Sequence, residues 1–331
     1  MKTQNFDKYF LIDTPSPIQK LANLSRHLGC ESIFVKRDDL GGLGGGGGKL
    51  RKLEYIIAEA VKQGSDTLVV TGATHSNCAR LVAACAAKIG VACELVLAPS
   101  HYSENENLIS NGNALLNRMF GATTHLTSRM GGLDVMANAL ISELTRAGKK
   151  PYLIPLGATN ALGCLGYKDC AIETANQSRL LNIRFDRILM PNGSGGIQAG
   201  FVAGQVLQGL DPRTVIGISV YQNIQTATAT TFRVINETLN LLNSGITAEI
   251  TDVIIDDSQL RLGYGIPDDA TNEAIFLFGR LEGLILDPVY SGKAAAALLE
   301  NVKSQKYDNK ENILLLLTGG APSTFAYSDF L

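Results

Sequence analysis

Short apolar runs alternate with helix-like stretches along most of the 331-residue chain. The runs are rich in branched side chains and end in polar or glycine-containing turns, which is typical of buried parallel strands. They occupy residues 32–39, 66–72, 92–99, 151–157, 187–196, 214–221 and 312–320. Apolar residues recur at intervals of three and four, as in helices, over residues 52–64, 77–90, 134–148, 197–209 and 293–305. This alternation predicts an α/β fold built on open, mostly parallel sheets flanked by helices.

Length and composition indicate a two-lobed globular protein, because a single hydrophobic core usually stops growing near this size. The 45% hydrophobic and 18% charged residues argue against disorder. The net charge of −2 comes without a run of Lys or Arg, which favours a small-molecule partner over a nucleic acid. No apolar run reaches the roughly 18 residues of a membrane helix, and residues 1–10 lack the apolar core of a signal peptide. We therefore expect a cytoplasmic protein that contacts neither membrane nor nucleic acid.

The cysteines and histidines show no spacing typical of a disulfide framework or a metal site. We expect reduced, mostly buried thiols, since no CxxC pair occurs. The cysteines are Cys30, Cys78, Cys85, Cys93, Cys164 and Cys170. The histidines are His27, His75, His101 and His125. Because these histidines are scattered, we expect no bound metal.

Ligands of open α/β sheets bind at the carboxyl ends of the strands, where the connecting loops gather. One such loop, residues 41–48, has seven glycines among eight positions and leads directly into Lys49. It could be a flexible linker, or a backbone that approaches a ligand closely. Lys49, Arg51 and Lys52 could simply begin a solvated helix, but a basic first turn opposes the helix dipole and suggests a nearby anion.

Two further loops carry polar signals. Residues 71–80, TGATHSNCAR, end a strand and open a helix, for which Ser76 or Asn77 could be an ordinary N-cap. Residues 192–200, NGSGGIQAG, place glycines between a strand and a helix, as an anion cradle made of backbone N–H groups requires. This stretch matches neither the P-loop nor the dinucleotide fingerprint, so a lone phosphate is the economical interpretation.

The last loops contain two tyrosines. Tyr264 lies in residues 263–269 and Tyr290 in residues 286–293, and a third loop follows the final strand at residues 317–327. Each tyrosine could be a core residue with a satisfied hydroxyl, which is the commoner role.

Taken together, these motifs resemble the D-cysteine desulfhydrase and 1-aminocyclopropane-1-carboxylate deaminase family, from about Thr14 to Tyr327. The matching stretches are KRDD, GGxKLRKLE with glycine at the variable position, the SN pair, PYLIPLGATNALGCLGY, NGSGGIQAG, GYGIPDD, LDPVYSGK and LTGGAPSTFAY. The resemblance implies the two-lobed fold type II of tryptophan synthase β, usually a homodimer, with pyridoxal 5′-phosphate (PLP) between the lobes. It implies a larger PLP-binding domain of residues 1–52 and 165–331, and a smaller α/β domain of residues 53–164.

The resemblance also implies residue roles. Lys49 would form the Schiff base with PLP and then accept a substrate proton. Lys52, three residues on and on the same helix face, would reach the PLP phosphate. Asn77 would lie beside the phenolic oxygen of the cofactor, and Ser76 would meet the substrate carboxylate or assist proton transfer.

The remaining implied roles belong to the later loops. The phosphate loop corresponds to Ser194, Gly195, Gly196 and Ile197. Tyr264 and Tyr290 would face the substrate, and Thr318 would lie near the pyridine nitrogen.

The chain departs from the family pattern at four positions. Gly48 stands where relatives usually carry Asn before the Schiff-base lysine. His75 and Cys78 replace the Gln and His that flank the Ser-Asn pair, so they belong to the expected substrate contacts. Ile197 replaces a threonine of the phosphate loop, which leaves Lys52 and backbone N–H groups to hold the anion.

Ser291 bears on the reaction, since the deaminase has Glu at this position, near the pyridine nitrogen. A carboxylate there favours protonation of the pyridine nitrogen, and the protonated ring is a stronger electron sink. A hydroxyl at Ser291 or Thr318 suits β-elimination instead, such as the conversion of D-cysteine to pyruvate, ammonia and sulfide. The alternatives are β-replacement by a synthase, L-cysteate sulfo-lyase activity and 1-aminocyclopropane-1-carboxylate deamination. A protein that binds PLP or an amino acid without turnover is disfavoured by the retained Lys49 and its partners.

Overall fold

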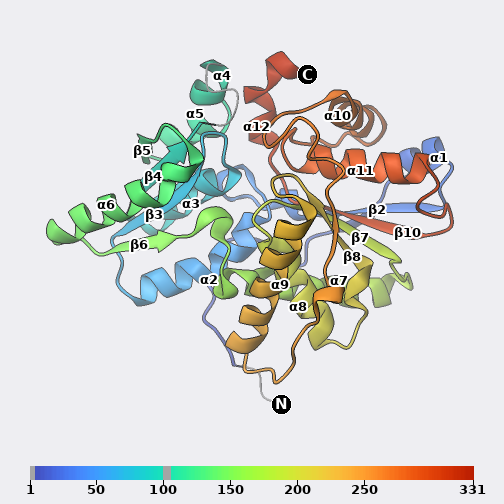
Figure 1. Ribbon diagram of the computed structural model, residues 1–331, viewed down its shortest axis with the longest axis horizontal. Helices are drawn as coiled ribbons and strands as arrows, with labels where there is room; N and C mark the ends of the chain where they lie inside the picture. Colours follow the sequence, from blue (N-terminus) through green and yellow to red (C-terminus); the bar gives the residue numbers. More distant parts are fainter. Residues whose placement is uncertain (1–3, 100–105) are drawn as a thin grey trace.

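Ten strands form two separate sheets in the computed structural model, which describes residues 4–99 and 106–331 (Figure 1). The six-stranded sheet has the order β1 (Ile18–Lys20), β2 (Ser32–Arg37), β10 (Asn312–Leu317), β7 (Arg187–Asn192), β8 (Val215–Ser219) and β9 (Ile254–Asp256). The four-stranded sheet has the order β5 (Thr123–Leu126), β4 (Ala92–Ala98), β3 (Thr67–Ala73) and β6 (Pro151–Ile154). Only the β1–β2 pairing among these strands is antiparallel.

Helices cover both faces of each sheet. In chain order they are α1 (Ala22–Leu28), α2 (Lys49–Lys62), α3 (Asn77–Ile89), α4 (Glu106–Ser110), α5 (Asn113–Met119), α6 (Leu133–Arg146), α7 (Ala161–Leu181), α8 (Gly196–Leu207), α9 (Ile224–Leu241), α10 (Asp269–Glu282), α11 (Ser291–Lys303) and α12 (Ala321–Ala326). The core clusters place α1, α10 and α11 on one face of the six-stranded sheet and α7, α8 and α9 on the other. In the four-stranded sheet, α2 and α3 pack on one face and α6 on the other.

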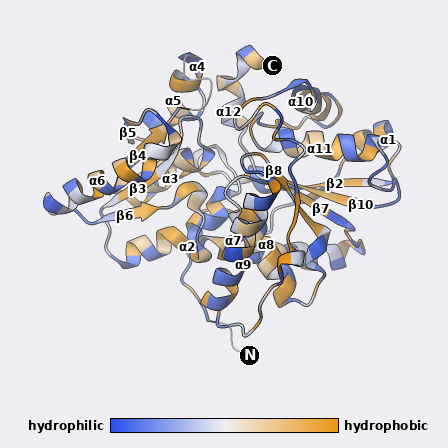
Figure 2. Cartoon of the chain, viewed as in Figure 1, coloured by the Kyte–Doolittle hydropathy of each residue, from blue (hydrophilic) through white to orange (hydrophobic). Residues whose placement is uncertain are grey.

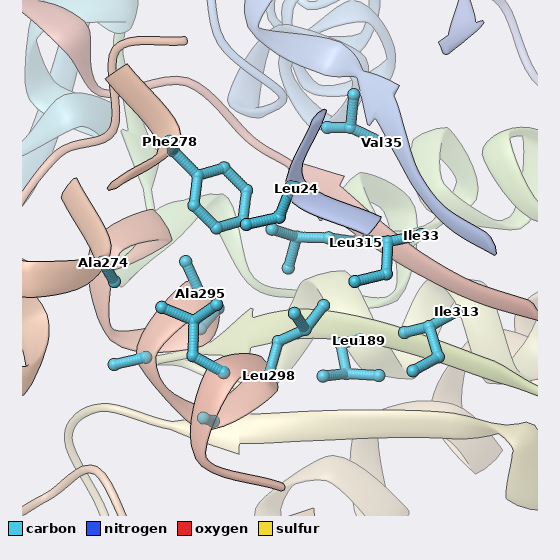
Figure 3. Packing of buried hydrophobic residues seen from close by; sticks show 14 of the residues in the cluster. Leu24, Ile33, Val35, Leu189, Ala274, Phe278, Ala295, Leu298, Ile313 and Leu315 are labelled. Carbon is cyan, nitrogen blue, oxygen red and sulfur yellow. The ribbon is translucent and has the colours of Figure 1, made fainter. Parts of the chain in front are cut away.

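Both faces of the six-stranded sheet are apolar at its centre, where the middle residues of β2, β10, β7 and β8 are buried and mostly hydrophobic (Figure 2). On β10, Ile313 and Leu315 face the α11 side, together with Leu298 of that helix (Figure 3). Leu314 and Leu316 point to the α7–α8 side. This alternation follows from the two-residue repeat of a strand.

The predicted strands and helices are confirmed, with ends that shift by a few residues. Three short strands that lie at or near sheet edges, β1, β5 and β9, were not predicted, because three or four residues are too few to show a period. Helices α1, α4, α5, α9, α10 and α12 were also not predicted, and neither was the longest helix, the 21-residue α7. Its Gly166 lies against the Arg51 backbone of α2, where a Cβ atom would overlap the Arg51 carbonyl oxygen. Glycine in this helix therefore serves close packing.

The six cysteines are buried and free, as the sequence predicts. His101 lies outside the described residues. Within residues 4–99 and 106–331, no group of three His, Cys, Asp or Glu side chains is placed to hold a metal ion. No helix in this described part is long and apolar enough to span a bilayer.

A buried ion network ties the start of α2 to the rest of the protein. Arg51 Nε lies 2.8 Å from Asp38 Oδ2, and its Nη1 lies 3.0 Å from Glu173 Oε2 on α7. Lys36 of β2 lies 2.6 Å from the same glutamate, and the Ser16 hydroxyl donates to Asp38 over 2.6 Å. Burial alone would raise the pKa of Asp38, but Arg51 and Lys36 hold it below the ordinary value. The aspartate therefore stays ionised in the interior.

We predict that Arg51→Met lowers the free energy of unfolding by about 3–5 kcal/mol, because it leaves two carboxylates without their main cation. Urea denaturation measures this loss. Arg213→Met is the control, since the Arg213 side chain is 65% exposed beside Asp211 and an exposed pair contributes about 1 kcal/mol or less. Equal losses in the two variants would contradict a stabilising role for the buried network.

Candidate active site

A cavity lies where the carboxyl ends of both sheets meet. The predicted site residues that line it are Lys49, Ser76, Asn77, Cys78, Ser194, Ile197, Tyr264, Tyr290 and Thr318. Other lining residues, which the sequence did not single out, include Met130, Leu156, Gly157 and Tyr221. Lys52, His75, Gly195, Gly196 and Ser291 lie outside this lining. The topology thus brings together loops that follow β3, β7, β8 and β10.

The glycine run is a fixed turn in the structure and not a free linker. The Gly48 N–H donates to the Thr318 carbonyl over 2.9 Å, and Arg80 Nη2 donates to the Gly46 carbonyl over 2.6 Å. Gly46 has a φ of 74°, and a Cβ atom there would overlap the carbonyl oxygens of Asp39 and Gly41. Only glycine fits this position without moving the backbone.

Gly48 leaves room for the hydroxyl of Tyr167. This tyrosine of α7 is fully buried, and a Cβ atom at Gly48 would overlap its hydroxyl oxygen. The next atom of the ring, Cζ, would be 3.2 Å away. The Tyr167 hydroxyl therefore occupies the space that a side chain at position 48 would need.

Lys49 is the first residue of α2 and projects into the cavity. Burial lowers its pKa, although the nearby Cys78, Cys164 and Asp287 oppose that shift. A lowered pKa increases the fraction of neutral amine, which is the nucleophilic form.

An anion cradle forms around Lys52, one helical turn further on. Lys52 Nζ donates to the Gly157 carbonyl over 2.9 Å and to Thr159 Oγ1 over 2.7 Å, and that hydroxyl lies 2.6 Å from Ser194 Oγ. A Cβ atom at Gly196 would overlap Lys52 Nζ. Burial, and then the charge of Lys49, lower the pKa of Lys52 to about 7.

Helix α8 begins at Gly196, with Gly195 in the left-handed region at φ 81°. Its first N–H groups have no partner within the helix, so they add donors beside Lys52, Thr159 and Ser194. Thr159 was not identified from the sequence, although it lies just after β6 in the stretch 151–167 that carries the family resemblance. Its position after a strand was the available signal.

Ser76 is the N-cap of α3, as one interpretation of the sequence expected. Its Oγ accepts from the Ala79 N–H over 3.1 Å. The hydroxyl hydrogen remains available to donate into the cavity, next to the unpaired N–H groups at the start of α3. A carboxylate would find both a hydroxyl and a helix N-terminus here.

Two tyrosine hydroxyls meet at the cavity. Tyr264 Oη lies 2.5 Å from Tyr290 Oη, and the ring of Tyr221 lies 5.1 Å from the ring of Tyr264. Burial raises the pKa of Tyr264 to about 12 and raises that of Tyr290 further. Both phenols therefore stay protonated, and one hydroxyl hydrogen of the pair remains for a ligand.

His75 lies behind this tyrosine pair. Its ring centroid is 5.5 Å from that of Tyr264 and 5.9 Å from that of Tyr327. Burial lowers its pKa to about 4, so the ring is neutral. His75 supports Tyr264 by packing, and the substrate contact predicted for its side chain stays a prediction.

Ser291 and Thr318 differ in their access to the cavity. The Ser291 hydroxyl donates to Asp287 Oδ1 and accepts from the Asp287 N–H over 2.8 Å. Asp287, which the sequence did not single out, also accepts from the backbone of Tyr290 over 2.9 Å. Thr318 lines the cavity directly, so of the two predicted hydroxyls it is the better placed to meet a ligand.

Comparisons with known proteins match nearly the whole chain. The model of a family described as pyridoxal-phosphate dependent enzyme matches residues 9–319. A D-cysteine desulfhydrase of Serratia proteamaculans is 38% identical over 327 residues, with 98% of this chain and 97% of that protein covered. One of Salmonella choleraesuis is 36% identical, with 97% and 96% covered.

Solved structures extend the likeness to three dimensions. The crystal structure of an ACC deaminase homologue superposes with a TM-score of 0.87 at 35% identity, over 98% of this chain and 95% of that one. A fungal L-serine ammonia-lyase of Rhizomucor miehei has a TM-score of 0.66 at 17% identity, over 96% and 97%. That second likeness concerns the fold alone.

We predict that Gly48→Ala destabilises the protein by about 1–3 kcal/mol, because the new methyl group overlaps the Tyr167 hydroxyl. Adding Tyr167→Phe removes that oxygen and should recover most of the loss. Gly42→Ala is the control within the same loop, since no atom lies within 4 Å of a Cβ there. Thermal melting compares the four proteins. A double variant as unstable as Gly48→Ala alone would refute the steric explanation.

Proposed function

Because the chain belongs to the pyridoxal-phosphate dependent enzymes, we propose that it eliminates the β substituent of a small amino acid, with D-cysteine as the foremost substrate. The products would be pyruvate, ammonia and sulfide. The observation that carries this proposal is the convergence of Lys49, Ser76, Asn77 and the Tyr264–Tyr290 pair on one cavity. The α/β type II fold and the two mostly parallel sheets predicted from the sequence are confirmed.

The residues present fit PLP. The cradle of Lys52, Thr159, Ser194 and the α8 N-terminus provides donors for a phosphate, while Gly196 leaves it room. Lys49 supplies an amine in the same cavity. When bound, PLP supplies an electron sink for the pair left on the substrate α-carbon.

The protein side chains have separable tasks. Lys49, whose pKa is lowered by burial, can accept the α-proton in its neutral form. The Ser76 hydroxyl and the start of α3 can bind the substrate carboxylate. The Tyr264–Tyr290 pair keeps its protons and can donate one toward a departing thiolate. These tasks match what β-elimination requires.

The apolar part of the cavity favours one leaving group over another. Met130, Leu156 and Tyr221 line it together with the tyrosine pair. A sulfonate such as that of cysteate would lose water against these side chains, which is unfavourable for a full charge. A thiol is the better fit, which supports cysteine over cysteate.

We also propose that the protein is a homodimer in the cytoplasm. The family resemblance supports the dimer, and six free buried cysteines suit a reducing compartment. We likewise propose the larger domain of residues 1–52 and 165–331 and the smaller one of residues 53–164. Support comes from the sheets, since the four-stranded one draws its strands from within residues 67–154.

We predict that Lys49→Ala abolishes the visible absorption band of lysine-bound PLP and the release of pyruvate from D-cysteine. Lys62→Ala, at an exposed position of the same helix, should keep both. The substrate panel is D-cysteine, L-cysteine, β-chloroalanine, cysteate and 1-aminocyclopropane-1-carboxylate. A band without pyruvate or ammonia from any of them would overturn the lyase proposal. Added thiol or amine nucleophiles would then test β-replacement.

We predict that anion binding to the PLP-free protein weakens as the pH rises through 7. The cationic form of Lys52, whose pKa is about 7, attracts the anion, so its charged fraction falls above that pH. Affinity for sulfate, which stays dianionic, should fall roughly tenfold between pH 7 and 8.5 in calorimetric titrations.

Two variants identify the titrating group. Lys52→Met should bind sulfate weakly at every pH. Lys49→Ala should keep the pH dependence but move its midpoint upward, because the charge of Lys49 contributes to lowering the pKa of Lys52. If Lys49→Ala removes the pH dependence, Lys49 and not Lys52 is responsible.

A further inference from the structure

A buried hydrogen-bond cluster lies behind Asn77, where the starts of α3, α5 and α12 meet (Figure 1). Asn113 Nδ2 lies 2.7 Å from the His75 carbonyl oxygen, 2.8 Å from Asn77 Oδ1 and 2.9 Å from Ser323 Oγ. The Ser323 hydroxyl in turn donates to Asn77 Oδ1 over 3.1 Å. Asn113 and Ser323 are each 1% exposed. The cluster is therefore shielded from water.

The backbone of His75 settles how these amides are oriented. A carbonyl oxygen can only accept, so the group of Asn113 that faces it must be the NH2. That same NH2 group faces Asn77, which must therefore present its oxygen. A reversed Asn77 would set two NH2 groups against each other and would leave the Ser323 hydroxyl without this acceptor.

This arrangement leaves one group of Asn77 for the cavity. Its oxygen is used by Asn113 and Ser323, while Asn77 itself lines the cavity. The NH2 group is thus the part that a ligand meets. A donor selects for an acceptor, and an anionic oxygen is the strongest acceptor it can have.

Asn113 fixes the orientation of Asn77 but leaves one of its own polar atoms without a hydrogen-bond partner in the described part of the chain. Its Oδ1 is buried and has no hydrogen-bond partner among the described residues. An unpaired buried acceptor is unfavourable, so packing alone does not account for an amide at this position. The cluster also joins distant parts of the chain, because α5 follows β4 of one sheet and α12 follows β10 of the other.

We propose that Asn113 and Ser323 are positioning residues that hold the Asn77 amide with its N–H groups toward the cavity, where they bind the phenolate oxygen of PLP. This inference rests on the proposed function, since it requires PLP as the ligand. It assigns to Asn113 and Ser323 a task that is carried out through Asn77 and not by direct contact with the cofactor.

A double-mutant cycle tests the proposal. Asn113→Ala should raise the dissociation constant of PLP roughly tenfold, the value of about one hydrogen bond. It should also move the pH midpoint of the visible band, which is the pH at which the absorption band of lysine-bound PLP is half converted. The reason is that a hydrogen-bond donor to the phenolate is weakened. In a chain that already carries Asn77→Ala, the same substitution should change neither quantity further.

Other variants separate positioning from damage to the fold. Ser323→Ala should shift both quantities in the same direction by a smaller amount, and it completes the cycle if Asn113→Ala does not fold. Asn236→Ala is the control, because its side chain also bridges backbone groups, on α9, away from the cavity. It should leave PLP binding and the midpoint unchanged.

Two results would overturn the proposal: equal effects of Asn113→Ala with and without Asn77, or no effect of either Asn113→Ala or Ser323→Ala on PLP binding and the midpoint. Failure of the proposed function looks different. In that case the wild-type protein binds no PLP, or it binds PLP and releases no product from the substrate panel.

Discussion

The charge of Arg51 is the constraint on which the site depends. The first turn of α2 carries Lys49, Arg51 and Lys52, and a positive charge on any of these basic side chains is unfavourable beside the others at the positive end of a helix. Asp38 and Glu173 neutralise the middle one inside the protein. Because these carboxylates belong to the loop after β2 and to α7, the same contact fixes α2 against the six-stranded sheet. The two lysines are held at defined positions on either side of it.

Glycine is used in this protein chiefly to let segments approach closely. Gly166 admits α7 to the backbone of α2, Gly196 makes room for Lys52, and Gly48 makes room for Tyr167. Each of these contacts lies within a few residues of Lys49 or of the anion cradle. The precision of the site thus depends on backbone-to-backbone and backbone-to-side-chain contacts that any larger residue would push apart.

The sequence predicted the features that produce a local pattern of residues, such as strands and helix faces. Branched apolar runs identified the long central strands, and the three-residue spacing of Lys49 and Lys52 placed both on one face of a helix. The family resemblance supplied most of the residues that line the cavity, among them Tyr264 and Tyr290.

Features that arise only from tertiary contact were not predictable in this way. Helix α7 packs on two neighbours through glycines, so it lacks a clear apolar stripe. Thr159, Asp287 and Asn113 are ordinary polar residues until the fold places them beside Lys52, Ser291 and Asn77. Tyr221 reaches the cavity because the loop after β8 begins next to Tyr264.

The anion cradle has a consequence for how it tolerates substitution. Lys52 and Ser194 both contact the Thr159 hydroxyl, and Lys52 also donates to the Gly157 carbonyl. The three side chains therefore fix one another's positions. A change at any one of them would displace the other two, so their contributions to anion binding would not be additive.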